Sequence, residues 1–244
     1  MRYYYGINEV KELSDYLKSQ RFKKKKNAYY RIVGDGVLQI IMYDYNLNRN
    51  IRELSVGIQS MYSPLWNYLS SYPDSFANYP IPLFAGKRDY TEVITSGKRE
   101  SLITMSHHEQ LELLRNVVVS ALDLVKTQRE LLDIMNELDR IDQGSIRWNN
   151  IARYSPYLFI GEYKYAERVI ASILSQHRMA RIRKKQWSEE NNIPLLLEDN
   201  PIEDIELSQL LEMAITHNTQ TIEEYLNTNC SRNQAIMGCV QDFL

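Results

Sequence analysis

The chain has 244 residues and 44% of them are apolar, so it can bury a substantial core, which excludes a mostly disordered chain. Its 29 lysine and arginine residues stand against 31 acidic residues, and the net charge of −2 excludes a global attraction to polyanions. Neither the first residues, MRYYYGINEV, nor any later stretch has the apolar run of a signal peptide or a membrane span, so we expect a cytoplasmic protein without membrane contact.

Cysteine and tyrosine usage adds two expectations. The two cysteines, Cys230 and Cys239, are too few for a disulfide framework and show no Cys/His metal spacing, so we expect reduced thiols and no metal or cofactor. Most of the 18 tyrosines fall in the first hundred residues. Tyrosine has an apolar ring and a polar tip, which suits both the rim of a sheet and a contact surface.

The first predicted element is a helix over residues 8–20. Asn8 can cap it, and Val10, Leu13 and Leu17 recur at helical spacing on one face.

The lysine run of FKKKKNAYYR, residues 22–31, follows that helix directly. Cations suit the negative end of a helix, where the last carbonyl groups need water or another partner. The run is therefore predicted as a corner between helix and strand with an exposed basic edge. Phe22 is expected in the core, and of Tyr29 and Tyr30, which begin the strand, one is expected to face inward and the other outward.

An antiparallel sheet is predicted next. Residues 28–33 and 37–45 are typical of two strands joined by the glycine turn GDG, and residues 51–61 alternate as a third strand. The proline-rich stretch 63–83 predicts a packed, irregular excursion. Residues 89–95 predict a further edge strand.

One long helix is predicted over residues 106–142. Ser106 and Glu109 form a capping box, and apolar residues follow at a nearly unbroken heptad spacing. The heptad residues are Leu111, Leu114, Val118, Ala121, Val125, Leu132 and Met135. Further helices are expected over 156–187, over 202–217, and from a capping box of Thr221 and Glu224.

This order of elements predicts an α+β fold, in which an N-terminal helix packs on an antiparallel sheet of about three to five strands and an all-helical C-terminal region follows. We place an α+β domain at residues 1–104 and a helical domain, opened by the long helix, at residues 105–244.

The N-terminal part resembles a bacterial family known as the domain of unknown function numbered 4304. The residues that match its pattern are Phe22, Lys23, Tyr30, Arg31 and Gly57. The family usually has glycine where this chain has Arg21, and amide residues where Met42 and Asp44 stand. The resemblance covers about the first hundred residues and implies a helix packed on an antiparallel sheet. It carries over no catalytic residue.

A weaker resemblance concerns the C-terminal part. Gly161, Tyr163 and Ala166 stand at the spacing that opens the second helix of a tetratricopeptide-like unit. Pro156 interrupts the preceding helix, Trp148 is out of register and no second copy follows. The resemblance implies one helical hairpin of that packing style and excludes a repeat array.

Two motifs resemble parts of known kinds of reactive or binding site. In HHEQLE, His108 and Glu112 lie one helical turn apart with Glu109 alongside, but a zinc protease needs a second histidine where Glu112 stands. The motif is better explained as the polar first turn of the long helix. The GDG turn leads into a strand and not into a helix, so it offers no helix N-terminus to a phosphate group.

A basic and an acidic segment follow each other in the C-terminal part. The basic tract contains Arg178, Arg181, Arg183, Lys184 and Lys185, and residues 189–206 are acidic without lysine or arginine. We expect the two segments to neutralise each other across a turn. If the basic tract is unpaired, RNA or an acidic protein is its natural partner.

We therefore expect a non-catalytic, protein-binding or regulatory module, of a kind that includes immunity proteins, with a homodimer through the heptad face as a further option. The candidate contact residues are Lys23, Lys24, Tyr29, Tyr30, Arg31, Tyr43, Tyr45, Trp66, Tyr68, Arg181, Arg183, Lys184 and Lys185. The alternative is a nucleic-acid-associated protein that uses residues 23–31 and 178–185, with tyrosines stacking on bases. A metal-dependent hydrolase around His108 is the remote third option.

Overall fold

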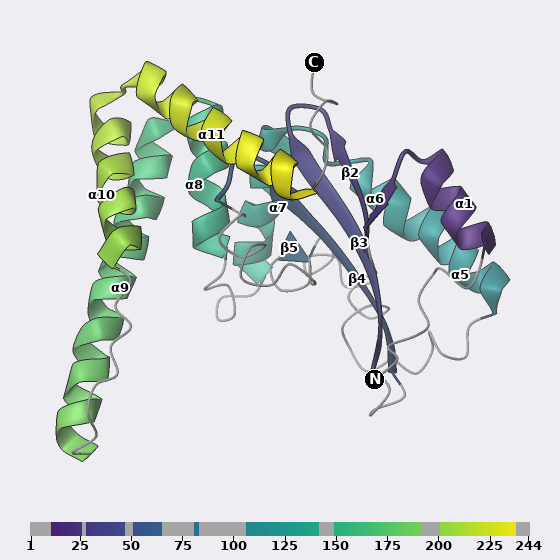
Figure 1. Ribbon diagram of the computed structural model, residues 1–244, viewed down its shortest axis with the longest axis horizontal. Coiled ribbons are helices and arrows are strands. Elements are labelled where there is room, and N and C mark those ends of the chain that lie inside the picture. The colour runs from purple at the N-terminus through teal and green to yellow at the C-terminus, as the bar shows by residue number, and fades with distance from the viewer. Residues whose placement is uncertain are drawn as a thin grey trace.

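The computed structural model describes residues 11–25, 28–46, 51–64, 81–82, 106–141, 149–191 and 201–237. It has the α+β fold predicted from the sequence: an N-terminal helix, an antiparallel sheet and a helical C-terminal region. In Figure 1, helices α1 and α5 lie on one side of the sheet, helices α8 to α10 lie on the other side, and α11 runs from the end of α10 back to the sheet. No helix of the described ranges is long and apolar enough to cross a membrane.

Helix α1 (Lys11–Ser19) packs on the sheet through Leu13 and Leu17, which are almost fully buried. The helix ends in a Schellman motif. The backbone N–H of Phe22 donates to the carbonyl of Leu17 at 3.0 Å, and the N–H of Arg21 donates to Lys18 at 2.9 Å. Arg21 has a φ of 64°, in the left-handed region that favours glycine. This is the residue at which family 4304 usually has glycine.

Replacing Arg21 with glycine is expected to stabilise the protein. Because glycine adopts left-handed backbone without steric cost, Arg21→Gly should raise the free energy of unfolding by about 1 kcal/mol. Urea unfolding followed by circular dichroism measures the change. Lys18→Gly, inside the same helix, should instead lower it by about 1 kcal/mol, and a loss in both variants would contradict the left-handed conformation of Arg21.

The sheet contains five strands in sequence order: β1 (Lys23–Lys25), β2 (Ala28–Val33), β3 (Val37–Asn46), β4 (Ile51–Ser60) and β5 (Ile81–Pro82). All neighbours pair antiparallel. Two predictions need correction here. The lysine run is itself an edge strand and not only a corner, with Lys23 opposite Tyr30. Ile81 and Pro82, in the stretch predicted to be irregular, pair with β4. The strand predicted over 89–95 lies outside the described residues.

The two tyrosines point to opposite faces of β2, but the expectation that one of them faces outward is wrong. Tyr29 and Tyr30 are only 1% and 5% exposed, because elements cover both faces of β2. The hydroxyl of Tyr29 donates to Ser14 of α1 at 3.0 Å. The hydroxyl of Tyr30 donates to the carbonyl of Met237, at the end of α11, at 3.2 Å.

The GDG turn between β2 and β3 is confirmed. Gly34 and Gly36 have φ values of 52° and 94°, and the N–H of Gly36 donates to the carbonyl of Val33 at 3.2 Å. A Cβ atom on Gly34 would lie 1.9 Å from the carbonyl oxygen of Lys126. Glycine is therefore required at position 34 both by the backbone conformation and by the close approach of another chain segment.

The single long helix predicted over 106–142 is wrong. The Ser106 capping box is present and opens α5 (His107–Leu113), but a π-helical turn η2 (Leu114–Val119) and the short α6 (Ser120–Leu122) follow, and the helix then ends. Helix α7 (Gln128–Ile141) starts anew. A second capping box explains the restart: the N–H of Thr127 donates to the Glu130 carboxylate at 2.9 Å, and the N–H of Glu130 donates to the Thr127 hydroxyl at 3.2 Å.

The Glu130 carboxylate should make stability depend on pH. Hydrogen bonds, first from the N–H of Lys126, hold the pKa of Glu130 below its ordinary value of 4.5. A lowered carboxyl pKa contributes stability above the ordinary value, and that contribution is lost as the pH falls through the folded-state pKa. Urea unfolding of the protein and of Glu130→Gln should therefore differ at neutral pH and converge below pH 4.5. A difference that persists at acidic pH would contradict this role.

The heptad residues do not form a seam on the protein surface. Six of them, all except Ala121, are at most 2% exposed, and all seven pack in one cluster with side chains of α1, the sheet and the other helices. A second copy of the chain therefore cannot reach this face. The cluster extends from Leu13 to Leu226 and includes residues from both sides of the predicted boundary at residue 104.

The C-terminal helices partly match their predictions. The helix expected over 156–187 is two helices, α8 (Asn149–Phe159) and α9 (Tyr163–Asn191), with Pro156 inside α8. They turn at Gly161, whose φ is 77°, and pack against each other as a helical hairpin, while the tetratricopeptide-like resemblance itself stays a prediction. Helix α10 (Pro201–Thr216) is confirmed. Helix α11 (Thr219–Met237) begins before the predicted capping box, because the Asn218 side chain accepts from the N–H of Thr221 at 3.3 Å.

Helix α11 holds the end of β4 through a buried asparagine. The side-chain nitrogen of Asn233 donates to the carbonyls of Met61 and Ser63, both at 2.8 Å. Asn233 is fully buried, so these bonds replace water that the two carbonyls would otherwise bind.

Candidate functional site

Arg31 of β2 is the centre of the candidate site. Its side chain is only 10% exposed. Its Nε donates to Oε1 of Gln39 at 2.7 Å, one terminal nitrogen donates to the carbonyl of Gln20 at 3.1 Å, and the other donates to Oδ1 of Asp123 at 2.7 Å. The guanidinium also lies 4.5 Å from the ring centre of Phe22. Arg31 therefore joins the end of α1, strand β3 and the connection before α7.

Gln39 fixes the far side of this arrangement. It is fully buried on β3, and its amide nitrogen donates to the carbonyls of Leu122 and Val125 at 2.6 and 2.8 Å. These carbonyls belong to the end of α6 and to the connection that follows, where the regular helical hydrogen bonds have ended. One side chain thus caps a helix end and orients the guanidinium.

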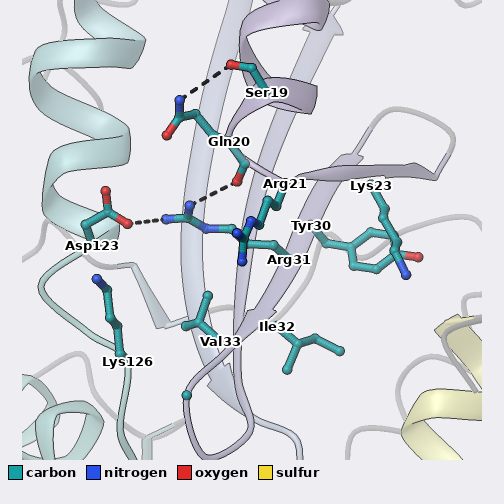
Figure 2. Close-up of a pocket in the computed structure, with 11 residues that line it drawn as sticks. Ser19, Gln20, Arg21, Lys23, Tyr30, Arg31, Ile32, Val33, Asp123 and Lys126 are labelled. Carbon is teal, nitrogen blue, oxygen red and sulfur yellow. Dashed lines mark hydrogen bonds and ion pairs between the residues drawn. The ribbon is translucent and has the colours of Figure 1, made fainter. Parts of the chain in front are cut away.

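An open pocket of about 650 Å³ lies over Arg31. We call it the Arg31 pocket and define it by its charged lining residues Arg21, Lys23, Arg31, Asp123 and Lys126. Figure 2 shows Arg31 between Asp123 and Gln20, with Lys126 below Asp123 and Lys23 on the other side of the strand. Among the described residues that line the pocket, four are cations and Asp123 is the acid, so the pocket carries an excess of positive charge.

The cations around the pocket are not equivalent. Arg31 is neutralised by Asp123 and buried, whereas Arg21, Lys23 and Lys126 are exposed. Lys23 has contacts of its own as well. Arg21 and Lys126 come from the end of α1 and from the connection before α7, so two separate elements bring exposed positive charge to the same pocket.

Three of the candidate contact residues in the N-terminal part line the pocket: Lys23, Tyr30 and Arg31. Lys24 is exposed on the edge strand β1. The rings of Tyr29 and Tyr30 are buried, so Tyr30 borders the pocket without offering an exposed ring to a partner. Tyr43 and Tyr45 lie on β3 with side chains outside the described part, and Trp66 and Tyr68 fall in undescribed residues.

The basic tract lies on the outer half of α9, at the opposite end of the molecule from helix α1 (Figure 1), whose last residue, Ser19, lines the Arg31 pocket. Arg181 pairs with Asp204 of α10, Nδ1 of His177 lies 2.8 Å from the same carboxylate, and Lys185 lies 3.9 Å from Glu189. The expected neutralisation by the acidic segment occurs at these residues. Lys184 has a contact of its own, and Arg183 is exposed.

The two carboxylates of the HHEQLE motif accept hydrogen bonds from nearby residues of the chain. Glu109 accepts from the N–H and hydroxyl of Ser106, and these bonds lower its pKa. Glu112 accepts from Asn116 at 2.6 Å. Within the described ranges, no group of three or more His, Cys, Asp or Glu residues is placed to hold a metal ion.

Sequence reasoning missed three residues of the site: Gln39, Asp123 and Lys126. Gln39 stands in an apolar strand, and the other two were assigned to the interior of a long helix. The sequence TQRE, residues 127–130, is a capping-box signature that marks the helix break and could have placed Asp123 and Lys126 in a connection.

Comparison of the chain with protein-family models, with curated proteins and with solved structures found no match. The resemblance to family 4304 therefore stays a prediction.

Proposed function

We propose that the protein is a non-catalytic binding module of a bacterial cytoplasm, with a regulatory or immunity-type role, and that the Arg31 pocket receives an acidic segment of a partner protein. The observation that carries this proposal is the convergence of Arg21 and Lys126 on a preformed pocket whose one lining acid, among the described residues, already pairs with Arg31. A partner that supplies negative charge would complete the site.

Two features favour a protein partner over nucleic acid. Among the described residues that line the pocket, the tyrosine is Tyr30, and its ring is buried, so these residues offer no exposed ring for stacking on bases. The second basic tract is partly neutralised by Asp204 and Glu189, so the described residues offer no continuous basic track for a polyanionic backbone.

Fluorescence anisotropy with a labelled peptide of alternating glutamate and serine tests the proposal. We expect the double variant Arg21→Gly/Lys126→Ala to bind the peptide about tenfold more weakly, because it loses two exposed charge pairs at the pocket. Arg183→Ala removes an exposed cation on α9 and is the matched control, expected to bind like the unchanged protein.

Other outcomes would contradict the proposal. Equal binding by the double variant would exclude the pocket as the contact site. Tighter binding of a single-stranded RNA of the same length, weakened by Arg183→Ala, would favour the nucleic-acid alternative.

A further inference from the structure

We infer that the group for which the Arg31 pocket is suited is a phosphate monoester on a side chain of the partner protein. This inference rests on the proposed function and names the chemistry that the same site would recognise. It is carried by the fixed guanidinium of Arg31, by the charge around it and by the walls of the pocket.

The guanidinium of Arg31 is held in place before any ligand arrives. A guanidinium has five N–H donors, and the bonds to Gln39, Gln20 and Asp123 use three of them, which leaves one N–H on each terminal nitrogen. A planar, fixed guanidinium with two donors suits the oxygens of a phosphate group, and little side-chain entropy remains to be lost on binding. Arg31 thus provides two fixed hydrogen-bond donors for an oxyanion.

The charge balance favours a dianion. Asp123 cancels the charge of Arg31, and the exposed cations Arg21 and Lys126 remain around the pocket. A phosphate monoester carries a charge of about −1.5 to −2 at neutral pH, whereas a carboxylate or a nucleic-acid phosphodiester carries about −1. The monoester therefore matches this excess of positive charge more closely than either alternative.

The rest of the pocket suits a side-chain phosphate on a polypeptide. Ser19 and Gln20 add a hydroxyl and an amide from the end of α1, and Ile32 and Val33 of β2 add half-buried apolar walls. A volume of about 650 Å³ exceeds what a phosphate ion needs and leaves room for neighbouring residues of the partner.

Replacing Asp123 is expected to strengthen binding, whereas replacing the cations of the pocket is expected to weaken it. Its side chain is 44% exposed and accepts from the same guanidinium that would bind the phosphate, so it repels the ligand. Asp123→Asn keeps an oxygen acceptor for Arg31 but removes the negative charge. This variant should bind a phosphopeptide several-fold more tightly, whereas a carboxylate peptide should gain less because it carries less charge.

The test compares three peptides of one sequence that differ at a central position, which is phosphoserine, glutamate or serine, at constant ionic strength. We expect the phosphoserine peptide to bind about tenfold more tightly than the glutamate peptide, to weaken as the pH falls below about 6, where the phosphate takes up a proton, and to lose this advantage in Arg21→Gly/Lys126→Ala. Thermal unfolding followed by circular dichroism checks that each variant is folded.

The outcomes separate the inference from the proposed function. Equal binding of the phosphoserine and glutamate peptides would overturn the inference and leave the proposed function in place. Binding of none of the peptides would overturn both. Inorganic phosphate or a single-stranded RNA that displaces the phosphoserine peptide at equal concentration would overturn a partner protein as the source of the phosphate group.

Discussion

Gly34→Ala is expected to destabilise the protein more than the same substitution at Gly36 or Gly161, the other glycines with positive φ among the described residues. The new Cβ would lie 1.9 Å from the carbonyl oxygen and 2.8 Å from the carbonyl carbon of Lys126, and the φ of 52° is strained for alanine. The Lys126 backbone cannot move away freely, because its N–H donates to Glu130 at 2.8 Å and the preceding carbonyl accepts from Gln39. Left-handed strain and overpacking together predict a loss of about 3 to 5 kcal/mol in unfolding free energy.

Gly161→Ala is the matched control for this measurement. Gly161 also has a positive φ, 77°, but a Cβ there would meet nothing within 4 Å. Its cost is therefore the backbone strain alone, about 1 to 2 kcal/mol. Equal losses for the two variants in urea unfolding would mean that the β2–β3 turn does not pack against Lys126.

Gln39→Leu is expected to cost about 3 to 5 kcal/mol in unfolding free energy. The substitution keeps an uncharged side chain of similar size, but it leaves the carbonyl of Val125 and the Nε of Arg31 without their partner. The carbonyl of Leu122 loses one of its two hydrogen bonds and keeps the one from the N–H of Val125 at 3.0 Å. Each buried polar group left unpaired costs about 1 to 3 kcal/mol. The Nε–H signal of Arg31 in a nitrogen-15 NMR spectrum should also broaden or shift, because the guanidinium loses its orientation.

Gln176→Leu on the exposed face of α9 is the control for Gln39→Leu. Gln176 is exposed and its amide nitrogen reaches only Ser172, at 3.4 Å, so its replacement should change the unfolding free energy by less than about 0.5 kcal/mol. A loss of similar size at both positions would show that Gln39 does not hold the end of α6.

Local patterns predicted the sheet well and the helix ends poorly. Alternation and the GDG turn located β2, β3 and β4, because strand period and glycine conformation act over a few residues. The heptad spacing of residues 111–135 predicted one helix, yet its apolar residues are buried on both sides of a break at residues 123–127. Periodicity reports which face is buried and cannot report that two helices share that face.

The candidate site was only partly visible in the sequence. Lys23 and Arg31 were found because they stand in a dense charge run and in the matched family pattern. The partners that give them a role, Gln39, Asp123 and Lys126, come from segments far along the chain, and Asp123 is 92 positions from Arg31. The exposure of Tyr29 and Tyr30 was mispredicted because α1 and α11 cover both faces of their strand.

The bonds of α11 have a consequence for how the protein forms during synthesis. Tyr30 binds the carbonyl of a residue 207 positions later, and Asn233 binds Met61 and Ser63 across 172 and 170 positions. The sheet leaves the ribosome early, but one of its faces and the end of β4 obtain their cover only after the last helix has been made. During that interval the nascent chain exposes apolar strands, and the lysines of the edge strand β1 are placed to keep them from pairing with other chains.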